Sequence, residues 1–316
     1  MTTHQSIAGM PFDTIGRPSL MSGWRRAMKR TLSAYALSAP AIVLMLIMLI
    51  GPLVSVLILA LTDYQLGVPT FEFIGLQNFK TLMGDSVFWT SLRNTLLYAA
   101  LVVPSSVTLG LGAALLIESG AGLRGFYRAV FFLPSLATLI AMAIVWEFML
   151  HPTFGIVNLT LVNLGLRPQN WLQDGQLALP ALAAIGVWQQ FGFNMVLFLA
   201  GLVTIPKHLY EAAALDGAPN AWERFRLVTW PMLGPVTLFV IVISAIRALQ
   251  VFDTVQALTK GGPNKATEVL LYTMYAEGFE FFRTGYASAV TVVFIVLVLT
   301  LTLAKTFILE KRVHYA

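Results

Sequence analysis

The chain contains no cysteine and only a small proportion of charged residues, and each shortage narrows its possible functions. Without cysteine it can form neither disulfide bridges nor thiolate metal sites. Charged residues make up 11% of the 316 residues, whereas a soluble domain carries roughly 25%. The four histidines are widely separated, and no phosphate-binding or nucleophile-elbow motif occurs. The sequence therefore predicts no catalytic residues, no metal site and no cofactor held by this chain.

Long apolar runs are the main feature that is present. Hydrophobic residues make up 57% of the chain, and the mean hydropathy is +0.77. A membrane-spanning helix needs about 20 mostly apolar residues. Six segments meet this requirement, at residues 34–61, 92–117, 126–150, 177–203, 231–255 and 285–309. We expect an all-α membrane protein with a six-helix transmembrane domain over 34–309, flanked by tails at 1–33 and 310–316.

The distribution of Lys and Arg predicts how these segments are oriented. Thirteen of the twenty lie in the tails and in the two connections on the same side, while six lie on the opposite side. Cytoplasmic loops carry an excess of Lys and Arg. We therefore expect both termini and the loop around Glu211 in the cytoplasm. The net charge of +5 then reflects membrane topology, and nucleic acid is not an expected partner.

The loop between the fourth and fifth segments carries the most specific pattern. Residues 211–215 are strongly helix-forming, Gly217 permits a sharp turn because glycine tolerates positive φ, and a second helical stretch follows at 221–228. Pro231 is expected to begin the fifth span. Residues 205–230 are thus predicted to form a helix–turn–helix along the membrane surface. An interfacial helix that only anchors in lipid is the alternative.

This loop resembles the EAA loop of the inner-membrane permease subunits of binding-protein-dependent, ATP-driven importers. The matching residues, in the family's order, are Tyr210, Glu211, Ala212, Ala213, Asp216, Gly217, Ala218 and Pro231. The loop departs from the family pattern in two ways, because it is one residue longer after Gly217 and has Trp230 in place of the usual leucine. A second stretch, residues 252–263 with its Gly261-Gly262-Pro263 turn, resembles the carbohydrate branch, which includes maltose and glycerol-phosphate permeases.

The resemblance implies a type I ABC importer permease fold in the bacterial inner membrane, forming one half of a pore for a sugar or sugar derivative. It also implies several partners besides lipid: a homologous second permease, an ABC ATPase dimer that holds ATP and Mg²⁺, and a periplasmic or lipid-anchored solute-binding protein. The same resemblance implies that this chain is coupled to the ATPase through Glu211, Ala212, Ala213, Asp216 and Gly217.

Polar residues within the apolar segments are candidates for the substrate path, because they are costly in lipid and tend to face the interior. The predicted path residues are Gly186, Trp188, Gln189, Gln190, Asn194, Ser244, Arg247, Gln250 and Asp253. Gly186, Gln189, Gln190 and Ser244, with Ala248 and Val251, approximately match the sugar-contacting positions of maltose-type permeases. The alternative is that these amides bond to one another between helices.

Arg247 is a cation expected well inside the fifth segment, away from its ends. On the substrate path it would favour an anionic or strongly polar substrate. It could instead extend to the outer surface, or pair with Asp253 or with an acid on the partner permease.

Two other function classes stay open at this point. A secondary, ion-coupled transporter would carry carboxylates near the membrane centre, and the nearest candidates, Glu147 and Asp253, lie towards the outer ends of their segments. An integral membrane transferase would need an acid, base or metal cluster at one interface, and the sequence indicates none.

Overall fold

The computed structural model of the protein describes residues 35–120, 122–218 and 220–304. The predicted tails at 1–33 and 310–316 lie outside these residues. The chain divides into two units, residues 1–55 and 56–316, and each is described by itself. Residues 35–55 of the first unit are helical and include a π-helical stretch, η1 (Leu46–Ile50). They belong to the apolar helix Tyr35–Leu59, whose last part is α2 (Gly51–Leu59).

Four further apolar segments are long enough to span a membrane, as the sequence predicts. They are α4 (Ser86–Ser119), α8 (Ala178–Thr204), α12 (Gly234–Leu249) with α13 (Asp253–Leu258), and α15 (Thr284–Ala304). The start of α4 is fixed by Asp85, whose side chain accepts a hydrogen bond from the backbone N–H of Val87 at 2.8 Å. Capping of this kind satisfies a donor that would otherwise lack a partner.

The third expected span differs from the prediction. Residues 126–150 do not form one continuous helix but two, α5 (Arg124–Leu136) and α6 (Leu139–Met149), with 102° between their axes. Pro134 near the end of α5 lacks the N–H that would bond the carbonyl of Val130, and Ala137 is extended (φ −72°, ψ 140°). The described residues thus provide five spans, or six if this bent pair crosses as one.

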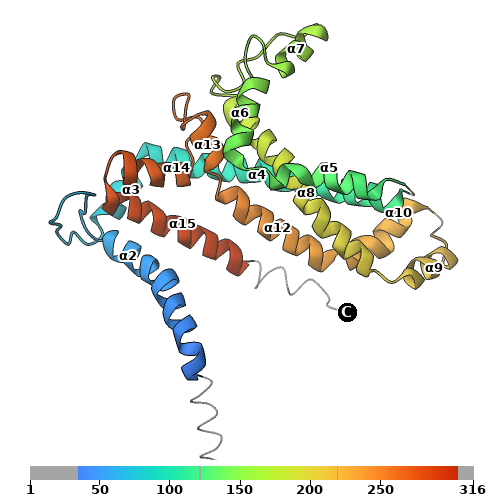
Figure 1. Cartoon of the computed structure of the whole chain (residues 1–316), viewed down its shortest axis with the longest axis horizontal. Helices are drawn as coiled ribbons and strands as arrows, with labels where there is room; N and C mark the ends of the chain where they lie inside the picture. The colour runs from blue at the N-terminus through green and yellow to red at the C-terminus, as the bar shows by residue number, and fades with distance from the viewer. Residues whose placement is uncertain (1–34, 121, 219, 305–316) are drawn as a thin grey trace, which may run out of the picture. The chain divides into compact units, whose positions relative to one another are not determined.

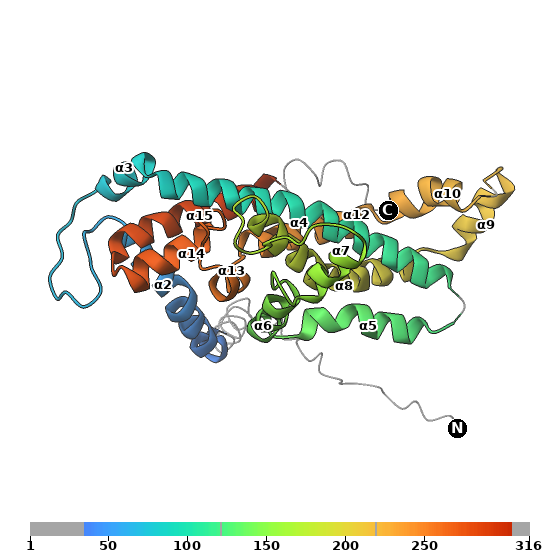
Figure 2. The same cartoon turned by 90° about the horizontal axis from the view of Figure 1, so that it is seen from above.

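Within the second unit, α8 packs against α4, α5 and α12, an arrangement visible in Figure 1 and from above in Figure 2. Two glycines allow the closest approaches. A Cβ at Gly110 of α4 would overlap the Asn194 side chain, and a Cβ at Gly192 of α8 would overlap the carbonyl of Phe131 on α5. These helices therefore meet backbone to backbone, as small residues permit in membrane bundles.

The two connections at residues 62–91 and 151–176 contain short helices of their own. Residues 62–91 include α3 (Gln77–Gly84), and residues 151–176 include α7 (Ile156–Asn163). Asn158 on α7 is buried; its Nδ2 donates to the Gln169 carbonyl at 2.8 Å, and its Oδ1 accepts from Trp171 Nε1 at 3.0 Å. One amide thus fixes the turn of this connection.

Residues 265–280 fold back onto α4 through hydrogen bonds between side chains of α4 and the backbone of this segment. They include α14 (Leu270–Tyr275) and the π-helical η3 (Ala276–Glu280). Asn94 Nδ2 donates to the carbonyls of Lys265 and Glu268 at 3.1 and 2.9 Å, and Thr95 Oγ1 accepts from the Leu270 N–H at 2.9 Å. Polar residues near the start of α4 therefore hold a segment that lies more than 170 residues away.

Candidate functional site

A cavity of about 230 Å³ brings together five of the nine residues predicted for the substrate path. Gln189 and Gln190 reach it from α8, Arg247 and Gln250 from the end of α12, and Asp253 from the start of α13. We call this space the polar cavity. Because these elements are separated in sequence, the cavity depends on the packing of α8 against α12.

Arg247 lies in the polar cavity as an unneutralised cation. Its guanidinium carbon sits 4.0 Å from the centroid of the Phe193 ring, a cation–π contact that stabilises the charge by about 0.5–2 kcal/mol. Among the described side chains Arg247 forms no ion pair, so the alternative in which it pairs with Asp253 is not seen. The guanidinium carbon lies over the ring, and a cation–π contact of this kind uses none of the N–H donors of the guanidinium.

Gln190 supplies an unmatched acceptor to the same cavity. Its Oε1 is buried and has no hydrogen-bond partner within the described part of the chain. A buried polar atom without a hydrogen bond lowers the stability of the fold by about 1–3 kcal/mol. A hydrogen-bond donor that enters the cavity would remove this destabilisation. The neighbouring Gln189 is held differently, because Ser135 Oγ donates to its backbone carbonyl at 2.7 Å and ties α5 to α8.

Asn194 and Ser244, also predicted for the substrate path, bind each other instead. Ser244 Oγ donates to Asn194 Oδ1 at 3.1 Å, and Asn194 Nδ2 donates to Ser106 Oγ at 3.2 Å. All three residues are at most 1% exposed. This interhelical network joins α4, α8 and α12, and for these two residues the structure supports the alternative of bonding between helices.

Gly186 and Trp188 do not themselves line the polar cavity. A Cβ at Gly186 would overlap the hydroxyl of Tyr98, so this glycine allows α8 to approach α4. The Trp188 ring meets Trp146 edge to face, with centroids 5.4 Å apart. Both residues therefore contribute to packing, whereas Val251, a family-matched position, does line the cavity.

The segment around Glu211 has the predicted helix–turn–helix geometry. The first helix is α9 (Lys207–Leu215), and Gly217 turns the chain with φ +93°. The second begins with α10 (Ala221–Arg224) and continues through the π-helical η2 (Phe225–Thr229) into α11 (Trp230–Met232). We call residues 205–230 the coupling segment.

The fifth span begins later than predicted. The helix of the coupling segment runs past Pro231, and α12 starts at Gly234 after a turn at Leu233. Pro231 has no N–H to bond a carbonyl in the preceding turn, and the π-helical stretch lies immediately before it. Single-turn π stretches of this type interrupt α-helices where the regular bonding pattern fails.

The coupling segment presents an exposed surface of mixed chemistry. Glu211, Ala212, Asp216 and Gly217 are exposed, whereas Ala213 is half-buried against the bundle. Two large apolar side chains beside them are also exposed, Leu215 at 89% and Trp222 at 70%. A hydrogen bond of 3.0 Å between Tyr210 and Thr229 joins the two helices. The two helices are therefore joined to each other, and their exposed apolar side chains are of the kind that receive a partner.

Two buried carboxylates in residues 265–280 are absent from the sequence prediction. Glu268 is 1% exposed; its Oε2 lies 3.2 Å from Lys265 Nζ, and its Oε1 accepts from Thr273 at 3.0 Å. Glu277 is 6% exposed and accepts from Arg283 Nη2 at 2.7 Å. Burial raises the pKa of Glu277, and the charge of Arg283 opposes that rise.

In the described residues, no three His, Asp or Glu side chains lie close enough to hold a metal ion.

Comparison with known proteins gives one consistent family. Residues 106–315 match the family described as binding-protein-dependent transport system inner membrane component. The sn-glycerol-3-phosphate transport system permease protein of Agrobacterium fabrum is 34% identical over 284 residues, covering 89% of this chain and 96% of the relative. The trehalose/maltose transport system permease protein of Thermococcus litoralis is 34% identical over 272 residues, covering 85% and 90%.

A solved structure extends the likeness to three dimensions. One chain of a bacterial alginate ABC transporter, in complex with a periplasmic protein bound to alginate pentasaccharide, superposes on this chain with a TM-score of 0.78. The two are 25% identical, and the match covers 89% of this chain and 94% of that chain.

Proposed function

The chain belongs to the family of inner-membrane components of binding-protein-dependent transport systems, and we propose that it forms one half of a pore that imports a sugar or sugar derivative. It is a multi-pass membrane protein with the type I importer permease fold. Its relatives are named for glycerol phosphate and for trehalose and maltose, which favours a hydroxyl-rich substrate over an ion or an amino acid.

The polar cavity is the observation that carries this proposal. Sugar hydroxyls both donate and accept hydrogen bonds, so they need a site of mixed chemistry. Arg247 offers donors only, Asp253 offers acceptors only, and the amides of Gln189, Gln190 and Gln250 offer both. The orphaned Gln190 Oε1 would accept a substrate hydroxyl. These five residues are proposed as this chain's part of the substrate path.

The coupling segment is proposed as the surface that receives an ATPase subunit. The exposed Glu211, Asp216 and Leu215 would contact the partner, while the Tyr210–Thr229 hydrogen bond transmits its movement to the end of the α10–α11 helix. ATP and Mg²⁺ would then be bound and used on the partner chain. This role places both termini in the cytoplasm, in agreement with the excess of Lys and Arg on that side.

The remaining partners follow from the same proposal. A second permease would complete the pore opposite the polar cavity, and a solute-binding protein would deliver substrate to the end that carries α3 and α7. An impermeant thiol reagent tests the orientation, because the chain has no cysteine of its own. A cysteine at position 260 should be labelled in intact cells, and one at position 207 should not.

The decisive experiment reconstitutes the assembled complex in proteoliposomes and measures ATP-dependent uptake of a panel of neutral sugars, sugar phosphates and acidic sugars. Uptake of at least one class, only with ATP and binding protein present, supports the proposal. Uptake driven by an ion gradient without ATP would overturn it in favour of a secondary transporter.

Gly217→Val tests the coupling segment separately. A β-branched residue at φ +93° strains the turn by about 1–3 kcal/mol. Uptake and substrate-stimulated ATP hydrolysis should fall about five- to a hundredfold, with less ATPase copurifying. Gly67→Val is the matched control, because Gly67 has φ +92° and the same open surroundings in the connection before α3. If both variants retain the ATPase equally, the coupling role of Gly217 is wrong.

A further inference from the structure

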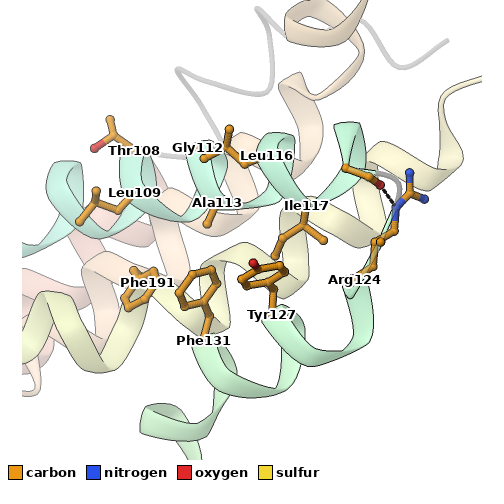
Figure 3. A pocket seen from close by; sticks show the side chains of 12 residues that line it. Thr108, Leu109, Gly112, Ala113, Leu116, Ile117, Arg124, Tyr127, Phe131 and Phe191 are labelled. Carbon is orange, nitrogen blue, oxygen red and sulfur yellow. Dashed lines mark hydrogen bonds between the residues drawn. The ribbon is translucent and has the colours of Figure 1, made fainter.

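A second, apolar cavity of about 580 Å³ lies between α4, α5 and α8. Leu109, Ala113 and Leu116 of α4 border it on one side, and Tyr127 and Phe131 of α5 with Phe191 of α8 on the other. We call this space the apolar slot. Figure 3 shows the three aromatic rings standing in a row towards α4, with Phe131 6.2 Å from Tyr127 and 5.7 Å from Phe191 between ring centroids.

A single cation stands at one end of the apolar slot. Arg124 donates from Nε to the Gly120 carbonyl at 2.5 Å and from Nη2 to the Glu118 carbonyl at 2.6 Å. These two bonds hold the side chain in place and use two of its five N–H donors. Its Nη1 lies 3.8 Å from the Glu118 carboxylate, and the side chain remains 44% exposed. A fixed guanidinium with free donors is suited to a phosphate oxygen.

We propose that the apolar slot binds one acyl chain of an anionic glycerophospholipid whose phosphate contacts Arg124. The lining is almost wholly apolar, which matches an acyl chain and not a sugar. At the slot's end, the Arg124 guanidinium offers donors to the phosphodiester, which would compete with the Glu118 carboxylate 3.8 Å from Nη1. Basic pockets between membrane helices bind lipid head groups in the same way.

The position of the slot gives the lipid a second role. Leu116 borders the apolar slot and also a separate hollow lined by Tyr210, Trp222 and Phe225 of the coupling segment. An acyl chain packed against Leu116 would therefore stabilise the end of α4 on which the coupling segment rests. This site is independent of the substrate path, so it can be tested without knowing the transported sugar.

The test uses the complex as assembled in cells, purified through a tag on this chain and placed in nanodiscs with equal phosphatidylglycerol and phosphatidylcholine. Native mass spectrometry then counts the retained lipids. We expect phosphatidylglycerol to be retained preferentially. Arg124→Gln should lower that preference about fivefold, the effect of one basic residue near an anionic lipid. Arg167→Gln, which changes an exposed arginine of another connection, is the control.

Gly112→Leu tests the slot itself. Gly112 lines the slot, and a Cβ there meets nothing within 4 Å, so a leucine can occupy the space without a clash. Retention of both lipids at this site should be lost. Gly125→Leu is the matched control, because Gly125 on α5 is equally open but does not line the slot.

Photocrosslinking covers the case in which a variant fails to assemble. With the unaltered complex, phosphatidylglycerol carrying a diazirine near the acyl terminus should label peptides from residues 108–131. Labelling confined to other regions would overturn the proposal, as would crosslinking that shows the second permease in the slot. Equal retention of the two lipids by the unaltered complex would also overturn it. None of these results depends on transport, so they leave the importer function untouched.

Discussion

The polar cavity and the interhelical network lie close together on the same two helices, yet their polar side chains behave differently. In the network, Asn194, Ser106 and Ser244 satisfy one another through bonds of 3.1 and 3.2 Å. In the cavity, Arg247 has only an aromatic ring beside it, and Gln190 Oε1 has no partner in the described chain. Polar residues inside a membrane bundle thus divide into those that bind each other and those kept available for a ligand.

This difference has a physical consequence for how each region responds to mutation. Removing a satisfied group leaves its partners unsatisfied and weakens the bundle. Removing an unsatisfied group costs little stability and removes only the bond it would make to a ligand. Stability and transport should therefore separate between the two regions.

Arg247→Gln should have the largest effect on transport. The change keeps polarity but removes the charge, and a hydrogen bond to a charged group contributes about 1.5–3 kcal/mol. Uptake should fall about ten- to a hundredfold, more steeply for anionic than for neutral substrates, while the complex stays assembled. Phe193→Leu removes the ring 4.0 Å from the guanidinium and should cause a smaller loss. A complex that loses subunits, or one that transports normally, would show that Arg247 is structural.

Asn194→Leu should chiefly affect stability. The network loses both hydrogen bonds of Asn194, and interhelical bonds in membrane proteins contribute about 0.6 kcal/mol each and at most about 1.7. Thermal unfolding of the purified complex should shift downwards by the equivalent of about 1–2 kcal/mol, with uptake per assembled complex unchanged. Ser244→Ala should give a smaller shift in the same direction. Reduced uptake at unchanged stability would instead place Asn194 on the substrate path.

Gln190→Met should impair uptake without lowering stability, which is the opposite of the result expected for Asn194→Leu. Methionine is close in size and removes the orphaned Oε1, so stability should stay the same or rise by up to about 1 kcal/mol. The apparent KM for uptake should rise about fivefold, the effect of one neutral hydrogen bond of about 1 kcal/mol. Gln256 is the matched control, because its Oε1 is also buried without a partner among the described residues and it does not line the polar cavity. If Gln256→Met impairs uptake equally, the cavity is not the cause.

The sequence predicts the helices well because their signal is local. Long apolar runs identify Tyr35–Leu59, α4, α8 and α15, and helix propensity with Gly217 identifies the coupling segment. The break between α5 and α6 is missed because Pro134 is compatible with either a continuous or an interrupted span. The helix α7 is missed because it is only eight residues long and depends on Asn158.

The division of polar residues cannot be read from the sequence for a different reason. Gln190 and Asn194 are both amides on α8, but their surroundings come from α4 and α12, which are distant in sequence. Asn194 meets Ser106 because Gly110 brings α4 close. Glu268 and Glu277 are similarly hidden, because their burial depends on how residues 265–280 fold back onto α4. Interhelical distances, and not residue types, decide these roles.

Glu277 offers the smallest expected effect and a third kind of polar residue, a buried charge with a partner. It lies outside the spans, 6% exposed beside Arg283. Burial raises its pKa above the ordinary 4.5, with Arg283 acting in the opposite direction. A raised pKa means that the folded state holds the proton more tightly, so the stabilising contribution is present below pH 4.5 and is lost as pH rises through the folded pKa.

Glu277→Gln resembles the protonated form and cannot titrate. The thermal stability of the variant relative to the unaltered complex should therefore increase as pH rises from about 4.5 towards 7. Glu280→Gln, which changes an exposed acid in the same π-helical stretch, should show no such trend. If the unaltered complex instead gains stability relative to Glu277→Gln over this range, the ion pair with Arg283 outweighs burial, and Glu277 behaves like the satisfied interhelical network.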